Sequence, residues 1–341
     1  MNGPTGAESP PGGLLTRHVV PPASPLPKGY ALESSEDGSQ LGVYELWRAS
    51  IARTGFGPDR DGALSESELA GRGAMAELEL EGRRLVVRRF RRGGAMRYLK
   101  LGYGNPWRPF EELALSDRLI REGLPTPRVA FARARPRPGK FGYDLDLGTD
   151  RIEQALDLGT WLERVRERRV GALERQRVIR AAGRLIARLH AAGLAHADLT
   201  PRNLMLEEPS REELEPRLWV IDLDKSVLRD RLTEAARTRN LRRLWRSVAR
   251  REGRGAKFVC RTDCARFLRA HQEQLDLASQ GPSGEALKSR TSWRGRWKRI
   301  ASGQKRAQFL HGLGWTLERI TGRGPAGRDG AAQVRSARDG S

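Results

Sequence analysis

The segment from residue 196 to residue 224 constrains this chain more than any other part of the sequence. It reads His-Ala-Asp-Leu-Thr-Pro-Arg-Asn at 196–203 and Trp-Val-Ile-Asp-Leu-Asp at 219–224. In this order, Asp198 can accept a hydroxyl proton, and Asn203 and Asp222 can supply oxygen ligands to Mg²⁺. Metal-dependent phosphoryl transfer requires these groups, so the sequence predicts a fold that brings the three together.

A helix and a strand are expected on either side of this loop. Apolar residues recur at helical spacing from 173 to 192, and Gly193 ends the pattern. The apolar run Leu218–Ile221 predicts a short buried strand that ends at Asp222, with 207–217 as the loop of a hairpin.

Two further interpretations concern the loop itself. We expect His196 to be structural, with its ring bonded to backbone so that it braces the loop. The simpler alternative makes Asp198 and Asn203 turn formers after a helix and Asp222 a strand-end cap.

Composition limits the class of protein. The chain has 341 residues, 38% of them hydrophobic, and no run approaches the roughly 20 apolar residues that span a bilayer. The first residues lack the basic start and apolar stretch of an export signal, so we expect a cytoplasmic protein. The net charge of +21 favours anionic partners, although the arginines are spread along the chain and many simply solvate the surface.

Four regions are expected along the chain. Residues 1–40 and 321–341 are rich in small and turn-forming residues without an apolar period, which predicts disordered tails. Residues 41–155 have the pattern of a strand-rich lobe, and residues 156–320 that of a mainly helical lobe that holds the catalytic loop.

Several elements can be placed within these lobes. Strands are expected at 76–80 and 85–90, joined by a tight Glu81-Gly82 turn, and again at 143–147. Helices are expected at 109–121, 240–251, 262–278 and 292–320. The basic and aromatic segment 293–300 is interpreted as a helix with buried tryptophans and solvated cations, and an anionic lipid interface is the alternative.

The candidate nucleotide-binding residues lie in the first lobe. Gly71 and Gly73 would let backbone amides approach phosphates, but the same pair suits an ordinary turn between strands. Arg88, on the strand after the hairpin, is the candidate cation for the phosphates, and Glu112 on the next helix is its candidate partner. An outward-facing surface role for Arg88 is the alternative.

Beyond these arguments, the sequence resembles the bacterial lipopolysaccharide core kinase family, and most of all its 3-deoxy-D-manno-octulosonic acid (Kdo) kinases. The similarity covers roughly 60–250. Its motifs are RLIARLHAAGLAHADLTPRNLML and LWVIDLDKS within 184–226, LVVRRFRRGG at 85–94, RPFEEL at 108–113, GLPTPR at 123–128 and NLRRLWRS at 240–247.

The resemblance implies an α+β fold with two protein-kinase-like lobes, an antiparallel-sheet N-lobe and a mainly helical C-lobe. It implies ATP and Mg²⁺ as cofactors, with Asp198 catalytic, Arg88 and Glu112 at the nucleotide, and Asn203 and Asp222 at the metal. The implied acceptor is a sugar hydroxyl of the lipopolysaccharide inner core, Kdo on a lipid A precursor, at the cytoplasmic face of the inner membrane. Peripheral contact with that anionic surface is left open.

Three other functions are alternatives to this one. A heptose or aminoglycoside-type kinase shares the HxDxxxxN loop, so acceptor identity must separate them. A pseudokinase scaffold would keep the fold without transferring phosphate, but the acid, amide and second acid are all present. A nucleic-acid-binding protein would use the positive charge alone, and no nucleic acid is expected here.

Overall fold

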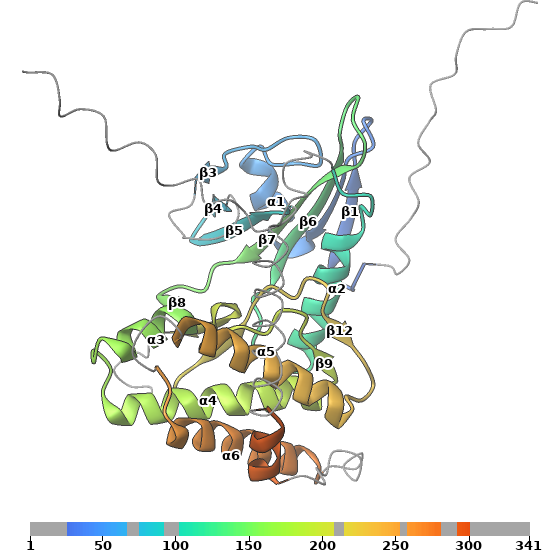
Figure 1. Cartoon of the computed structure of the whole chain (residues 1–341). Helices are drawn as coiled ribbons and strands as arrows, with labels where there is room; N and C mark the ends of the chain where they lie inside the picture. Colours follow the sequence, from blue (N-terminus) through green and yellow to red (C-terminus); the bar gives the residue numbers. More distant parts are fainter. Residues whose placement is uncertain are drawn as a thin grey trace, which may run out of the picture.

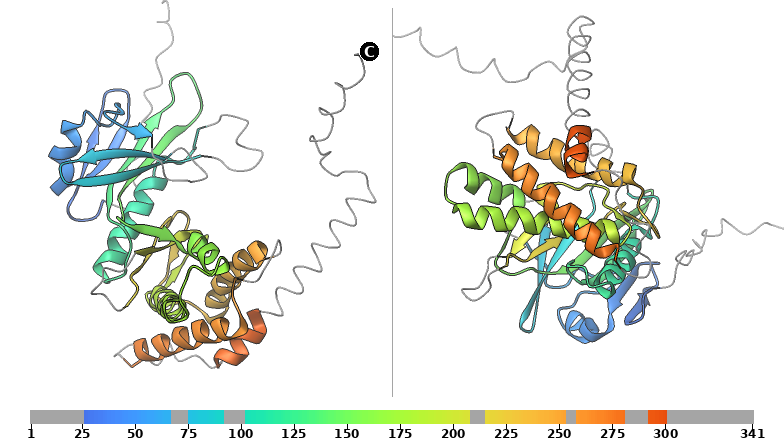
Figure 2. Two further views of the ribbon diagram at one scale, coloured as in Figure 1. Left: turned by 90° about the vertical axis from the view of Figure 1, so that its left-hand side faces the viewer. Right: turned by 90° about the horizontal axis from the view of Figure 1, so that it is seen from below.

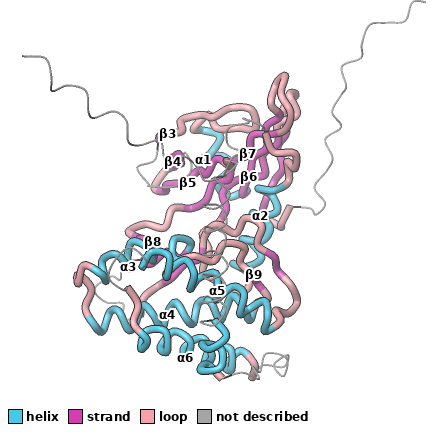
Figure 3. Tube along the Cα trace, viewed as in Figure 1, coloured by secondary structure: helices cyan, strands magenta, loops and turns pink. Residues whose placement is uncertain are grey.

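The computed structural model of the chain describes residues 26–66, 75–91, 102–207, 215–252, 258–280 and 292–300. A twisted sheet forms one lobe and a group of helices forms the other, and Figure 1 shows the sheet above the helices. Figure 3 separates the strand-rich lobe from the helix-rich lobe by colour. The predicted α+β fold with two lobes is therefore confirmed.

The N-lobe contains an antiparallel sheet of seven strands in the order β1-β2-β6-β7-β5-β4-β3. The expected hairpin is confirmed, because β4 and β5 pair directly and Gly82 turns between them with φ of 68°. The strands are β1 (Tyr30–Ser34), β2 (Gln40–Tyr44), β3 (Ser65–Glu66), β4 (Met75–Leu80), β5 (Arg83–Arg89), β6 (Val129–Pro136) and β7 (Tyr143–Asp150).

The N-lobe begins earlier than the sequence predicted. Residues 1–40 were expected to form a disordered tail, but β1 and the start of β2 lie within that range and pair antiparallel from Tyr30 to Tyr44. The prediction is wrong there because Tyr30 is buried and its hydroxyl donates to the Val129 carbonyl at 2.8 Å. This long-range contact is invisible to local composition. Residues 1–25, like the other tail at 321–341, lie outside the described residues.

Each face of the sheet is covered by a different segment. Helix α1 (Glu45–Arg53) and the loop after it pack on one face, over a core that includes Leu41, Leu85 and Phe131. Helix α2 (Arg108–Arg121) packs on the other face, where Phe110 and Leu113 meet Leu145 and Leu147. The same alternation sends Arg88 to the α2 side of the sheet.

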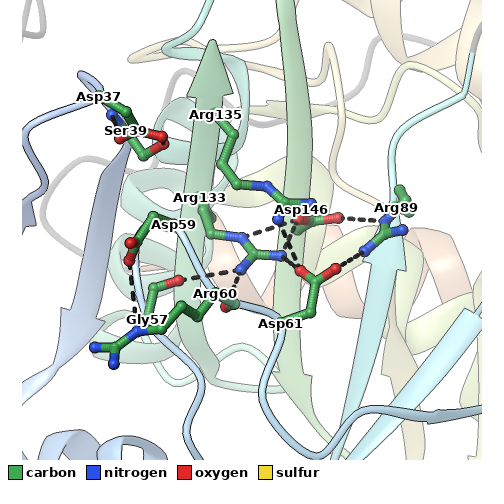
Figure 4. Close-up of polar contacts among 10 residues, drawn as sticks. All are labelled: Asp37, Ser39, Gly57, Asp59, Arg60, Asp61, Arg89, Arg133, Arg135 and Asp146. Atoms are coloured by element: carbon green, nitrogen blue, oxygen red, sulfur yellow. Dashed lines mark hydrogen bonds and ion pairs between the residues drawn. The ribbon is translucent and has the colours of Figure 1, made fainter. Parts of the chain in front are cut away.

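Buried charges fix the loop after α1 (Figure 4). Arg133 on β6 is fully buried and donates to Asp146, to Asp61 and to the carbonyls of Gly57 and Arg60. Asp146 is also fully buried and accepts from Arg89 at 3.1 Å. Because a buried arginine needs all its donors satisfied, the loop carbonyls are held against the sheet.

Helix α2 connects the lobes. It ends as predicted, since Gly123 follows with φ of 72° and its N–H donates to the Ile120 carbonyl. The chain then continues through Pro125, whose carbonyl accepts from Val220 of the C-lobe at 2.9 Å. Figure 2 shows α2 in teal between the sheet and the helices below.

The C-lobe is mainly helical, as expected. The predicted helix at 173–192 is confirmed, and Gly183 lets α6 approach it so closely that a Cβ would lie 2.5 Å from the Phe267 carbonyl oxygen. The helix at 293–300 is confirmed, with Trp293 and Trp297 partly buried against the core. The expectation that its cations are solvated is wrong for Arg296, which is fully buried and pairs with Glu234. Residues 301–320 lie outside the described residues. The helices are α3 (Leu158–Arg166), α4 (Ala172–Ala191), α5 (Glu234–Glu252) and α6 (Arg261–Ala278).

Short strands support the loop that carries the candidate site. The predicted hairpin is confirmed, because β10 pairs antiparallel with β11, and β10 also pairs with β8. A second short antiparallel pair is formed by β9, directly before the loop, and β12, after β11. The elements are β8 (Ala155–Asp157), β9 (Leu194–Ala195), the 3₁₀ turn η2 (Pro201–Asn203), β10 (Leu204–Glu207), β11 (Leu218–Val220) and β12 (Val227–Leu228). In the described part of the chain, no helix has the length and apolar character needed to cross a membrane.

Candidate active site

Arg88 lies at the junction of the two lobes and contacts carboxylates from both. Its guanidinium donates to Glu112 of α2 and, at 2.6 Å, to Asp222 after β11. It also lies over the Phe90 ring, 4.5 Å from the centroid. The expected pairing of Arg88 with Glu112 is confirmed, and an outward-facing surface position for Arg88 is excluded, since only 26% of its side chain is exposed.

Glu112 uses both of its oxygens. One accepts from Arg88 and the other accepts from the Leu223 N–H at 3.0 Å, so α2 is joined to the residue after Asp222. Burial raises the pKa of Glu112 to about 7, although the Arg88 charge opposes that rise. The carboxylate is therefore a positioning group whose charge depends on Arg88.

His196 braces the catalytic loop as predicted. Its Nδ1 accepts from the Asp198 N–H at 3.1 Å, and its Nε2 lies 3.1 Å from the Ile221 carbonyl, which can only accept. The ring is therefore in the Nε2–H form. Burial lowers the pKa of His196, which keeps it neutral and holds this pattern.

Asn240 of α5 holds the same loop from below, which the sequence analysis missed. Its amide accepts from the His196 N–H at 3.0 Å and donates to the His196 carbonyl at 2.9 Å. The buried side-chain amide of Asn240 thus satisfies both the N–H and the carbonyl of His196, which is not part of a strand. The motif NLRRLWRS contained this residue, but spacing alone gave no sign that it faces the loop.

Asp198 projects from this braced loop and remains accessible. Its side chain is 54% exposed and pairs with Arg243 of α5 at 3.0 Å. Its backbone carbonyl accepts from the Asn203 side-chain amide at 2.8 Å, so the acid and the amide belong to one compact turn.

Asn203 and Asp222 are neighbours across the hairpin. The Ile221 N–H donates to the Asn203 carbonyl at 3.1 Å, directly before Asp222. Asp222 itself has a left-handed backbone with φ of 59°, a conformation that Asp tolerates better than most residues. The structure therefore brings together Asp198, Asn203 and Asp222, and with them Arg88 and Glu112.

The donor set suits a hard cation. Asn203 uses its amide nitrogen for the Asp198 carbonyl, which leaves its oxygen for a metal, and Asp222 offers a second oxygen donor. No cluster of three or more His, Cys, Asp or Glu ligands occurs in the described ranges. Mg²⁺ is commonly held by one or two protein oxygens together with phosphates and waters, so these two residues fit it.

A second ion pair joins the lobes and was also missed. Arg108, at the start of α2, binds Asp224 with two parallel hydrogen bonds, and its guanidinium lies over the rings of Phe90 and Tyr103. No local pattern in the sequence paired Asp224 with a residue 116 positions away. The remaining predicted residues, Gly71 and Gly73, lie outside the described residues.

This arrangement is that of a protein-kinase-like phosphotransferase. The candidate proton acceptor Asp198 and the candidate oxygen ligands Asn203 and Asp222 lie on the helical lobe. The cation Arg88 lies on the sheet lobe and pairs with Glu112 of α2.

Comparison with known proteins gives the family. The lipopolysaccharide kinase (Kdo/WaaP) family matches residues 64–271. The 3-deoxy-D-manno-octulosonic acid kinase of Xanthomonas axonopodis pv. citri (strain 306) is 35% identical over 193 residues, which cover 55% of this chain and 70% of the relative. The enzyme of the same name from Xanthomonas campestris pv. campestris (strain B100) is 32% identical over 224 residues, or 64% of this chain and 83% of the relative.

A solved structure supports the fold. WaaP in complex with acyl carrier protein superimposes with a TM-score of 0.50 at 20% identity, and covers 81% of this chain and 98% of that one. The chain belongs to the lipopolysaccharide kinase (Kdo/WaaP) family. It is a kinase with an alcohol group as acceptor, and the prediction of an inner-core lipopolysaccharide sugar kinase is confirmed.

Proposed function

We propose that this kinase transfers the γ-phosphate of ATP to a hydroxyl of Kdo on a lipid A precursor, with Mg²⁺ as the metal. Two relatives that carry the name 3-deoxy-D-manno-octulosonic acid kinase align with this chain over 70% and 83% of their lengths. That extent of similarity is the observation that favours Kdo over a heptose.

On the sheet side, Arg88 would bind the phosphates of the nucleotide. A guanidinium can bind two phosphate oxygens at once, and Glu112 orients it from α2. Gly71 and Gly73 remain candidates for backbone contacts to the phosphates. The phosphates of ATP would compete with Asp222 for Arg88.

On the helical side, Asp198 is the proposed catalytic residue. It accepts the proton of the acceptor hydroxyl, and the bracing by His196 and Asn240 fixes its position. Asn203 and Asp222 would hold Mg²⁺, which neutralises the developing charge on the phosphates when bound.

The place of action follows from the acceptor. A lipid-linked sugar keeps its acyl chains in a membrane, so the enzyme would work at the cytoplasmic face of the inner membrane as a peripheral protein. The net charge of +21 suits such an anionic surface.

The test uses the full chain with Mg-ATP and a Kdo-bearing lipid A precursor, and the product is followed by mass. We expect one added phosphate with the wild type. Asp198→Asn should lower the rate at least about 100-fold. The matched control is Asp144→Asn, because Asp144 is an exposed aspartate of β7 that pairs with Arg137 at 3.4 Å, away from the proposed site.

Acceptor identity is decided in the same assay. A heptose-bearing core without an accessible Kdo, and an aminoglycoside, replace the precursor in parallel reactions. Faster turnover of either would overturn the Kdo assignment, and equal product from wild type and Asp198→Asn would remove Asp198 from the catalytic role.

A further inference from the structure

Helix α5 carries a line of arginines, one of which pairs with the proposed catalytic base. Four arginines are exposed on this helix at spacings of four, three and four residues, so they share one face over about 16 Å. They are Arg239, Arg243, Arg246 and Arg250. We call this set the arginine stripe.

The stripe lacks the acids that accompany exposed arginines elsewhere. On α2, Arg118 pairs with Glu122, and on α3, Arg166 pairs with Glu163. The acids of α5 lie at its ends, where Glu234 binds Arg237 and Glu252 accepts from Val259. Within the ranges that the structure describes, no carboxylate pairs with the three stripe members other than Arg243.

Such an arrangement has an energetic cost. Like charges three or four residues apart destabilise a helix by a few tenths of a kcal/mol for each pair. An isolated run of arginines would be a solvated surface and nothing more. The stripe differs, because one of its members pairs with Asp198 of the catalytic loop.

Arg243 is that member, and its pair with Asp198 is suited to exchange. The two side chains are 45% and 54% exposed, and exposed ion pairs contribute little to stability. An acceptor anion can therefore replace Asp198 as the partner of Arg243 at small cost. The carboxylate of Asp198 would then be released toward the acceptor hydroxyl.

We infer that the arginine stripe is the acceptor-binding surface of this kinase and takes the anionic groups of the lipid-linked sugar, its carboxylate and its phosphates. Arg243 would hold the group next to the reacting hydroxyl, and Arg239, Arg246 and Arg250 would bind the groups farther away. Guanidinium groups suit both anions because they bind carboxylate and phosphate oxygens in pairs. This inference rests on the proposed function for the identity of the acceptor.

The test measures acceptor binding without ATP and acceptor KM with ATP. The Kdo-bearing lipid A precursor is presented in uncharged detergent micelles to the full chain. The variant is Arg239→Gln with Arg246→Gln, because neither residue contacts Asp198. The matched control is Arg180→Gln, an exposed arginine of α4 outside the stripe.

We expect the double variant to bind the precursor at least about 20-fold more weakly and to raise its KM by a similar factor. The KM for ATP should stay the same. Arg246→Lys should recover part of the loss, because it keeps the charge without the paired donors. Arg180→Gln should bind like the wild type.

The outcomes separate the two proposals. Wild-type binding without phosphate transfer would refute the Kdo kinase assignment and leave the stripe standing. Unchanged binding by the double variant would refute the stripe whatever the turnover. An equal loss of binding to phosphatidylglycerol vesicles that contain no Kdo would also overturn it, because the stripe would then contact the membrane surface and not the acceptor.

Discussion

The guanidinium of Arg88 donates to the carboxylate of Asp222 at 2.6 Å across the junction of the lobes. One residue comes from a strand of the sheet and the other follows a strand of the helical lobe, 134 positions later. The proposed phosphate-binding cation thus pairs with a proposed metal ligand. Mg-ATP would separate them, since phosphates attract Arg88 and Mg²⁺ attracts Asp222.

Replacement of Arg88 tests this relationship. Arg88→Met should lower kcat/KM at least about 100-fold, because the phosphates lose their charged donor. Arg88→Lys should retain more activity but less than the wild type, because an ammonium cannot reach Glu112 and Asp222 with a planar fork. Steady-state kinetics with varied ATP would measure both.

The control for Arg88 lies on the same strand. Arg84 lies on the same side of β5 as Arg88. It pairs with Glu153 at the surface, where the two side chains are 45% and 51% exposed. Arg84→Met should leave kcat/KM within about twofold of wild type. Near-normal turnover by Arg88→Met would contradict the assigned role.

Much of this site was predictable because it is encoded locally. Asp198, Asn203 and Asp222 lie within one helix–loop–hairpin, and the hairpin follows from an apolar run and its turn. Arg88 and Glu112 were also found, because a hairpin and a helix with a clear stop place them. Local order and periodicity therefore sufficed for the residues that lie on regular elements.

The rest depended on contacts between distant residues. Nothing near Asn240 shows that its amide bonds to the backbone of His196, and nothing near Arg108 shows Asp224. The strand at Tyr30 pairs with the neighbouring β2, but the hydroxyl of Tyr30 donates to the Val129 carbonyl 99 positions away, and local composition gave no sign of that contact. Polar pairs of this kind have no period, so spacing cannot reveal them.

Glu112 should give the enzyme an acidic limit near neutral pH. Burial raises its pKa to about 7, and only the ionised form pairs with Arg88. We expect kcat/KM to fall as the pH drops through this value. The Glu112→Gln variant should have low activity and should lack this acidic fall in kcat/KM. Glu111 is an exposed neighbour on the same turn, so Glu111→Gln should keep the wild-type pH profile.

The same carboxyl should affect stability in the opposite direction. Its pKa rises from 4.5 to about 7 on folding, so between these values the folded protein binds more protons than the unfolded chain. The free energy of unfolding should therefore decrease as the pH rises through this window, by on the order of 3 kcal/mol from this group. Urea unfolding of wild type and Glu112→Gln from pH 4.5 to 7.5 would measure the difference, and parallel curves would contradict it.

Asn240 should be required for both stability and turnover. Asn240→Ala leaves the buried N–H and carbonyl of His196 without partners, which costs about 2–4 kcal/mol. The loop that carries Asp198 would also lose its support, so kcat should fall at temperatures where the protein remains folded. Asn105→Ala is the control, because that amide accepts a single exposed bond from the Trp107 N–H. Equal denaturation midpoints for the two variants would argue against the clamp.

Arg133 should be a main determinant of N-lobe stability, independent of catalysis. Arg133→Met leaves Asp146 buried with only Arg89 and removes the donor to the Gly57 and Arg60 carbonyls, which should cost about 3–5 kcal/mol. Adding Asp146→Leu should recover part of this loss, because no charge then remains buried without its partner. Chemical denaturation of the single and double variants measures the recovery, and a double variant less stable than Arg133→Met would show that Asp146 contributes more through Arg89 than through Arg133.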